Sequence, residues 1–112
     1  MKALLMTPLL LAVAATSGQA QESLAEAEAI WNNQCAKCHG KDGKGQTKMG
    51  LRINAANLAD PAVQEKISDE RILEVMMNGA KDEKGKVVML PAKNVTDDQL
   101  QQLVEYVRSF AK

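Results

Sequence analysis

The clearest pattern of apolar and polar positions lies near the C-terminus, over residues 96–110. Apolar residues recur there at the spacing of one helix face: Leu100, Leu103, Val104, Val107 and Phe110, with Tyr106 beside them. The preceding Thr96-Asp97-Asp98-Gln99 has the form of a capping box, in which Thr and Gln side chains bind the first free amides of a helix. The pattern therefore predicts an amphipathic helix that begins at Thr96.

A similar pattern predicts a helix in the first third of the chain. Ser23-Leu24-Ala25-Glu26 is a second capping box, and the apolar positions that accompany it have helical spacing: Leu24, Ala27, Ile30, Trp31 and Cys35. We expect this helix to include Cys35-Ala36-Lys37-Cys38-His39. It should end near Gly40, because glycine readily adopts the left-handed conformation that ends many helices.

Two shorter helices are predicted between these two. An aspartate and a proline at residues 60–61 open one of them, which extends to about residue 66. Ser68 begins the other, which ends at residues 78–79 and carries three apolar residues on one face: Ile72, Val75 and Met76.

The remaining segments show neither a helical nor a strand period. Residues 40–45 are rich in glycine and charge, residues 49–59 have no clear pattern, and residues 81–86 form a charged turn. Residues 87–91 are a short apolar stretch whose final proline disfavours helix at the residue before it. Four helices without a strand pattern predict an all-α protein.

The first 20 residues have the layout of a secretory signal peptide. Lys2 gives a basic start, an apolar run extends from Ala3 to Ala15, and Gly18-Gln19-Ala20 provides the small residues of a cleavage site. The alternative is an uncleaved membrane anchor, but the run is shorter than the ~20 residues that a spanning helix needs. We expect cleavage after Ala20, one mature domain over residues 21–112, and a periplasmic location in a Gram-negative bacterium.

Charge and size narrow the possibilities further. The chain has 14 basic and 14 acidic residues, so no strongly basic surface for nucleic acid is expected. No segment after the signal peptide is apolar enough to span a membrane. A domain this small buries little apolar surface, and it has only three aromatic residues: Trp31, Tyr106 and Phe110. A large apolar cofactor at its centre would enlarge this core.

The segment Cys35-Ala36-Lys37-Cys38-His39 has the most specific chemistry in the chain. Two cysteines separated by two residues and followed directly by histidine are typical of covalent haem attachment. In a helix, both sulfurs lie on one face and can reach the two vinyl groups of one porphyrin, while His39 can bind the iron. These are the only cysteines and the only histidine of the chain. We therefore expect one haem c, attached through Cys35 and Cys38, with His39 as an axial ligand.

The second axial ligand is expected to be a methionine, because thioether sulfur is the natural remaining donor. The candidates outside the signal peptide are Met49, Met76, Met77 and Met89. Met49 is close to His39 along the chain, and Met76 and Met77 lie on a predicted helix, where methionine commonly fills the core. Met89 is in a non-helical stretch far enough along the chain to reach the opposite face. It is the favoured ligand, and the other three remain candidates.

Several of these segments together resemble a small bacterial class I cytochrome c, over nearly the whole mature chain. The resemblance rests on the attachment segment with Gly40, on Asp42-Gly43 and Gly45 after it, on Met89 to Pro91 ahead of Thr96, and on residues 103–110. It implies a small all-α cytochrome c fold, with about four helices around one covalently bound haem. It also implies that the first and last helices cross, through Ala27, Trp31, Leu103 and Tyr106.

The function implied by this resemblance is one-electron transfer, without enzymatic activity, by a monomer with six-coordinate haem. Redox partner proteins would dock transiently near an exposed haem edge. Lysines surround both parts of the expected site: Lys37, Lys41, Lys44, Lys48, Lys84, Lys86 and Lys93. They form either a solubilising surface or a positive ring that steers acidic partners.

Two positions depart from the common pattern of this family. Leu90 stands between Met89 and Pro91, whereas methionine directly precedes proline in many members. Residues 52–54 contain no proline, although many members have one there whose carbonyl orients the haem-binding histidine. The hydrogen-bond partner of His39 therefore stays open.

The cysteines and the haem are also compatible with other functions. A disulfide or thiol redox motif would leave His39 and Met89 without a role, and a zinc site would lack a fourth ligand. A haem protein with a labile sixth ligand could bind gases or act like a peroxidase, although the chain has no second histidine for acid–base chemistry. A fixed subunit of a larger oxidoreductase complex is also compatible with the sequence.

Overall fold

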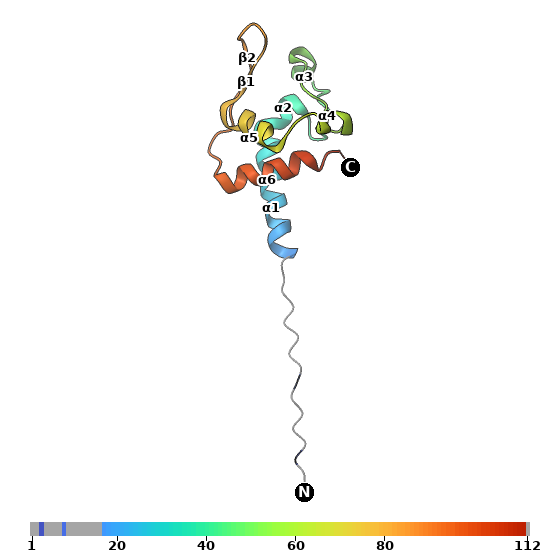
Figure 1. Ribbon diagram of the computed structural model, residues 1–112, viewed down its shortest axis with the longest axis vertical. Helices are drawn as coiled ribbons and strands as arrows, with labels where there is room; N and C mark the ends of the chain where they lie inside the picture. Colours follow the sequence, from blue (N-terminus) through green and yellow to red (C-terminus); the bar gives the residue numbers. More distant parts are fainter. Residues whose placement is uncertain (1–2, 4–7, 9–16, 112) are drawn as a thin grey trace.

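The structure is a computed structural model that describes residues 3, 8 and 17–111. The apolar run of the expected signal peptide therefore lies almost entirely outside the described residues. The described chain is mostly helical, and its elements are shown in Figure 1. None of the described helices combines the length and the apolar character needed to cross a membrane.

Six α-helices and one short hairpin make up the described chain. The helices are α1 (Ser17–Ile30), α2 (Ala36–His39), α3 (Lys48–Ile53), α4 (Pro61–Glu65), α5 (Asp69–Asn78) and α6 (Asp97–Arg108). A π-helical turn, η1 (Trp31–Cys35), joins α1 to α2. Strands β1 (Ala80–Lys81) and β2 (Val87–Met89) pair antiparallel, with Ala80 opposite Met89.

Side-chain caps confirm three of the predicted helix starts. The Asp60 carboxylate accepts a hydrogen bond from an amide of α4 at 2.9 Å, and the Ser68 hydroxyl accepts one from an amide of α5 at 3.1 Å. At α6 the capping box is complete, since Thr96 and Gln99 each accept a hydrogen bond from the other's backbone amide. These bonds satisfy amides that a helix leaves free in its first turn.

The predicted start of the first helix at Ser23 is wrong. The helix α1 begins at Ser17 and passes through Ser23 without a break. The residues between them, Gln19-Ala20-Gln21-Glu22, are good helix formers. Inside a continuous helix a capping box has no free backbone amide to bind, so its sequence signal loses its meaning there.

Two segments predicted to lack regular structure contain short elements. The helix α3 occupies part of residues 49–59, and Thr47 caps it by accepting a hydrogen bond from the Gly50 amide at 2.8 Å. The charged turn after α5 closes the β1–β2 hairpin, where the Asp82 carboxylate accepts hydrogen bonds from two amides, those of Lys84 and Lys86. Both elements are too short to produce an apolar period that the sequence could reveal.

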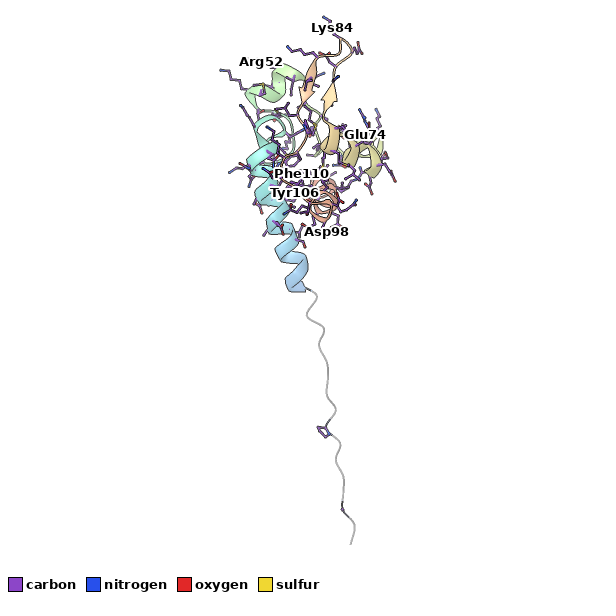
Figure 2. The ribbon with its side chains drawn as sticks, turned by 90° about the vertical axis from the view of Figure 1, so that its left-hand side faces the viewer. Arg52, Glu74, Lys84, Asp98, Tyr106 and Phe110 are labelled. Atoms are coloured by element: carbon purple, nitrogen blue, oxygen red, sulfur yellow. The ribbon has the colours of Figure 1, made fainter. Side chains whose placement is uncertain are left out.

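The first and last helices cross at the centre of the molecule, as predicted. Ala27 and Leu103 are fully buried at this crossing, and Trp31 is 2% exposed. The Trp31 ring lies 5.0 Å from the ring of Phe110 and 5.9 Å from that of Tyr106. Figure 1 shows α6 crossing α1, and Figure 2 shows Tyr106 and Phe110 beside the first helix. A small residue at position 27 allows this close approach of two helices.

A buried polar network holds the segment around α4 to the end of α6. The Gln64 side chain, 7% exposed, donates hydrogen bonds to the carbonyls of Leu58 and Val107 at 2.7 and 2.8 Å. The Arg108 guanidinium donates to the Gln64 side-chain and backbone oxygens and to the Ile67 carbonyl. Because the Leu58 carbonyl lies in the loop that precedes α4, the network also orients this loop.

Candidate haem site

The attachment segment Cys35-Ala36-Lys37-Cys38-His39 lies at the end of a continuous helical stretch. The π-helical turn η1 precedes it, and the Ala36 amide donates to the Trp31 carbonyl, five residues back. Cys35 has a φ of −112°, so the helix is locally distorted where the segment begins. Cys35 and Cys38 are free and partly buried, and they lie three positions apart, on one side of the helix. No feature of the sequence indicated the π turn.

Three carbonyl groups at the end of this helix have partners, two in the following segment and one in the side chain of Trp31. The Cys38 carbonyl accepts a hydrogen bond from the Thr47 hydroxyl at 2.7 Å, and the His39 carbonyl accepts one from the Gly45 amide at 2.7 Å. The buried indole Nε1 of Trp31 donates to the Gly40 carbonyl at 2.9 Å. A helix end normally leaves such carbonyls without partners, so these bonds fix the position of the attachment segment.

Two glycines after this segment allow close backbone packing, Gly50 against Cys38 and Gly45 against Ala55. A Cβ atom on Gly50 would lie 2.2 Å from the Cys38 carbonyl oxygen. Gly45 has a φ of +72°, and a Cβ there would lie 2.7 Å from the Ala55 carbonyl oxygen. The backbone after the attachment segment is thus closely packed. The glycines lack a side chain that would prevent this packing, and Gly45 also adopts a positive φ.

The environment of His39 favours the neutral imidazole, which is the form that binds metals. Burial lowers the pKa of His39, and the backbone carbonyl of Ala56 opposes this shift. Among the described residues Nδ1 is buried and has no partner at hydrogen-bonding geometry. The backbone of Ala56 is therefore the polar group that acts on the imidazole of His39 from outside the attachment helix. A backbone partner of this kind leaves no signal in the sequence.

Burial also affects the first of the two thiols. It raises the pKa of Cys35 to about 11, and the neighbouring Cys38 adds to this rise. Cys35 is therefore protonated at neutral pH. A protonated thiol is a weak nucleophile and a poor metal ligand, which does not favour a metal-thiolate site at Cys35.

Met89, the favoured second ligand, lies at the end of β2 and is partly buried. Three links position the methionine loop, which we define as residues 89–95. The hairpin pairs Met89 with Ala80, the Ala92 amide donates to the Met76 carbonyl at 2.8 Å, and the Gln34 side chain binds the backbone of Lys93. Because Gln34 directly precedes Cys35, this last link brings the methionine loop next to the attachment segment.

The other methionine candidates have different surroundings. Met76 is 5% exposed and belongs to the central core, as expected for a methionine on the apolar face of α5. Met77 is 52% exposed. Met49 lies on α3, which together with the hairpin flanks α2 in Figure 1, with α2 between them.

The residues brought together at this site fit a covalently attached haem. Two partly buried thiols one helical turn apart match two thioether bonds, and the buried, unpartnered Nδ1 of a neutral His39 matches a ligand whose other nitrogen is bound to iron. A partly buried thioether on a separate loop provides a second soft donor.

Comparison with known proteins agrees with this geometry. The sequence profile of the family described as "Cytochrome c" matches residues 24–111. Among solved structures, the KustC0563 c-type cytochrome is similar, with 34% identity and a TM-score of 0.65 over 77% of this chain and 98% of that one. A point mutant of the same protein gives a TM-score of 0.63 at 34% identity, over 76% and 98% of the two chains. A comparison with curated proteins gave no significant match.

Replacing Gly50 with alanine should disturb the attachment segment. Its new methyl group would meet the carbonyl oxygens of Cys38 and Gly45 at 2.2 and 2.5 Å, so the backbone must move. We expect the free energy of unfolding, measured by denaturant titration of the haem-containing protein, to fall by about 3 kcal/mol. The haem-to-protein ratio of the purified variant should fall as well.

Gly85→Ala is the matched control for this change. Nothing lies within 4 Å of its Cβ position, and its cost comes only from the φ of +80°. We expect a loss of about 1 kcal/mol there. Equal losses in the two variants would show that the contact of α3 with Cys38 does not matter.

Proposed function

The chain belongs to the cytochrome c family and carries covalently attached haem c, and on that premise we propose that it is a periplasmic one-electron carrier. Its haem iron would be bound by His39 and Met89. The observation that carries this proposal is the link from Gln34 to Lys93, which holds the methionine loop beside the helix that bears Cys35, Cys38 and His39.

Each residue has a distinct part in this proposal. When bound, the haem supplies an iron that takes up and releases one electron. Cys35 and Cys38 would form its thioether bonds and keep it from dissociating, and the neutral, partly buried His39 would bind the iron through its imidazole. Met89 would bind the iron through its thioether, a ligand that favours the ferrous state. A ligand set held by a fixed helix end and a tethered loop changes little between oxidation states, which keeps electron transfer fast.

A stable methionine ligand distinguishes this proposal from a gas-binding or peroxidase-like haem protein. Those functions need an open or easily vacated sixth position. Here the methionine loop is bound to β1, to α5 and to the attachment helix. This tethering favours an electron carrier over an enzyme, whether the protein diffuses freely or belongs to a larger complex.

Export and partner docking complete the proposal. Residues 1–20 would direct the chain to the periplasm and be removed there, and residues 21–112 would form the mature protein.

All of the lysines around the site are exposed, and the two ion pairs among the described residues are made by arginines, Arg71 and Arg108. In Figure 2, Arg52 on α3 and Lys84 on the hairpin lie at the same end of the molecule. The positive charges are thus available to attract an acidic redox partner.

Replacing Met89 with alanine tests the proposed ligand. The oxidised variant should lose the sulfur-to-iron charge-transfer band of the visible spectrum, because no thioether would remain on the iron. Its reduction potential should fall by on the order of 0.1 V. Met77→Ala is the control, since that side chain is 52% exposed, and it should change neither property. Survival of the band in the Met89 variant would assign the ligand to Met49, Met76 or Met77.

The mass of the haem-containing protein from a periplasmic extract tests export. We expect the mass of residues 21–112 plus one haem, with Gln21 as the first residue. Ala20→Leu should slow removal of residues 1–20, because signal peptidases require a small residue at that position. Recovery of the wild-type haem protein with residues 1–20 still attached would contradict this prediction.

Oxidation of the reduced protein by small metal complexes tests the positive surface. The rate with the ferricyanide anion should fall as ionic strength rises, and the rate with a cationic cobalt complex should rise. Lys44→Glu should weaken the dependence of the ferricyanide rate on ionic strength. Lys66 is not one of the lysines around the site, so Lys66→Glu should leave this dependence nearly unchanged. Rates that do not respond to salt with either oxidant would mean that the lysines only keep the protein soluble.

A further inference from the structure

We propose that Gln34 is a positioning residue that holds the methionine loop on the attachment helix and thereby keeps Met89 from leaving the iron. The inference rests on the proposed ligation by Met89. It adds a residue that lies outside the attachment segment and was not among the residues predicted for the site.

The evidence is a pair of hydrogen bonds from one side chain. Gln34 Nε2 donates to the Lys93 carbonyl at 2.8 Å, and Gln34 Oε1 accepts from the Lys93 amide at 2.8 Å. Both backbone groups of Lys93 are therefore bound by a single amide, although the two residues are 59 positions apart. Two parallel bonds fix orientation as well as distance, as a short stretch of β-ladder would.

The position of Gln34 gives these two bonds their importance. Among the described residues, they are the hydrogen bonds that join the helix bearing Cys35 to the methionine loop. The neighbouring Ala92 amide binds α5 instead, at the Met76 carbonyl. Adjacent residues of the loop are thus hydrogen-bonded to two different elements, and among the hydrogen bonds of the described residues those of Gln34 join the loop to the attachment helix.

The side chain must be an amide to make this contact. Glutamine both donates and accepts, whereas a glutamate can only accept and a leucine can do neither. Asn94, next to Lys93, has a φ of +58°, so the backbone turns directly after the residue that Gln34 binds.

Loss of the contact should loosen the loop without unfolding the protein. Gln34 and Lys93 are both exposed, so water can replace the missing hydrogen bonds at little cost to global stability. The loop would nevertheless open more often, since water does not tie it to the helix. Opening of this kind frees the sixth position, and an added ligand can report it.

The experiment compares Gln34→Leu, Gln34→Glu and Asn33→Leu with the wild type, using only protein with haem fully attached. Asn33 is the matched control, because it is exposed, adjacent, and makes no side-chain hydrogen bond among the described residues. Two measurements are made on each: the rate of imidazole binding to the oxidised protein, and the hydrogen exchange of the Lys93 amide. Thermal unfolding is followed in parallel.

We expect Gln34→Leu to raise both rates by roughly tenfold, the effect of losing about 1.4 kcal/mol of local stability. Gln34→Glu keeps the bond from the Lys93 amide and should give a smaller rise in imidazole binding. If Gln34→Leu folds poorly, the imidazole rate of Gln34→Glu still tests the inference. Asn33→Leu should change neither rate.

Two results would overturn the inference, and they are distinguishable. If the wild type shows the sulfur-to-iron band and the Gln34 variants match Asn33→Leu in both rates, Gln34 does not position Met89, while ligation by Met89 stands. If the wild type lacks the band and binds imidazole as fast as the Met89→Ala protein does, ligation by Met89 itself fails.

Discussion

The hydrogen bond from the indole of Trp31 to the Gly40 carbonyl joins the core of this molecule to the end of its attachment helix, and the rest of the structure depends on these two parts. The ring of Trp31 is buried where α1 crosses α6, against Phe110 and Tyr106, and its centroid lies 5.6 Å from that of His39. The same side chain therefore packs the core and holds the end of the attachment helix. A small domain with few aromatic residues gains from this double use, because one buried group orients both its core and its site.

The two halves of the candidate haem site are positioned by different means. The half with Cys35, Cys38 and His39 is held through backbone carbonyls at a helix end, by a hydroxyl and an amide of the following segment and by the indole of Trp31. The half with Met89, the proposed ligand, is a loop after a short hairpin, held by hydrogen bonds to β1, α5 and Gln34. Backbone packing makes the first half rigid. The second depends on a few separable contacts, so single side chains can adjust it.

Much of this arrangement could be predicted because its signals are local. The caps at Asp60, Ser68 and Thr96 act on amides two or three residues away, so their sequence patterns correspond directly to structure. The capping pattern at Ser23 gave a wrong helix start, because a local pattern does not show whether the preceding residues are already helical. The helix α3 could not be predicted, because its packing on the Cys38 carbonyl, rather than its apolar pattern, accounts for its place.

The sequence by itself determined the haem-binding chemistry and the helical faces, and its resemblance to class I cytochromes c implied the protein class and the crossing of the first and last helices. Residue types and spacings are sufficient for the chemistry and the faces, because thioether formation and helical faces depend on positions three or four residues apart. Only the tertiary structure decided that Ala56 faces His39 and that Gln34 binds Lys93. Such contacts join distant backbone groups, and any residue type can supply a carbonyl or an amide, so the sequence carries no mark of them.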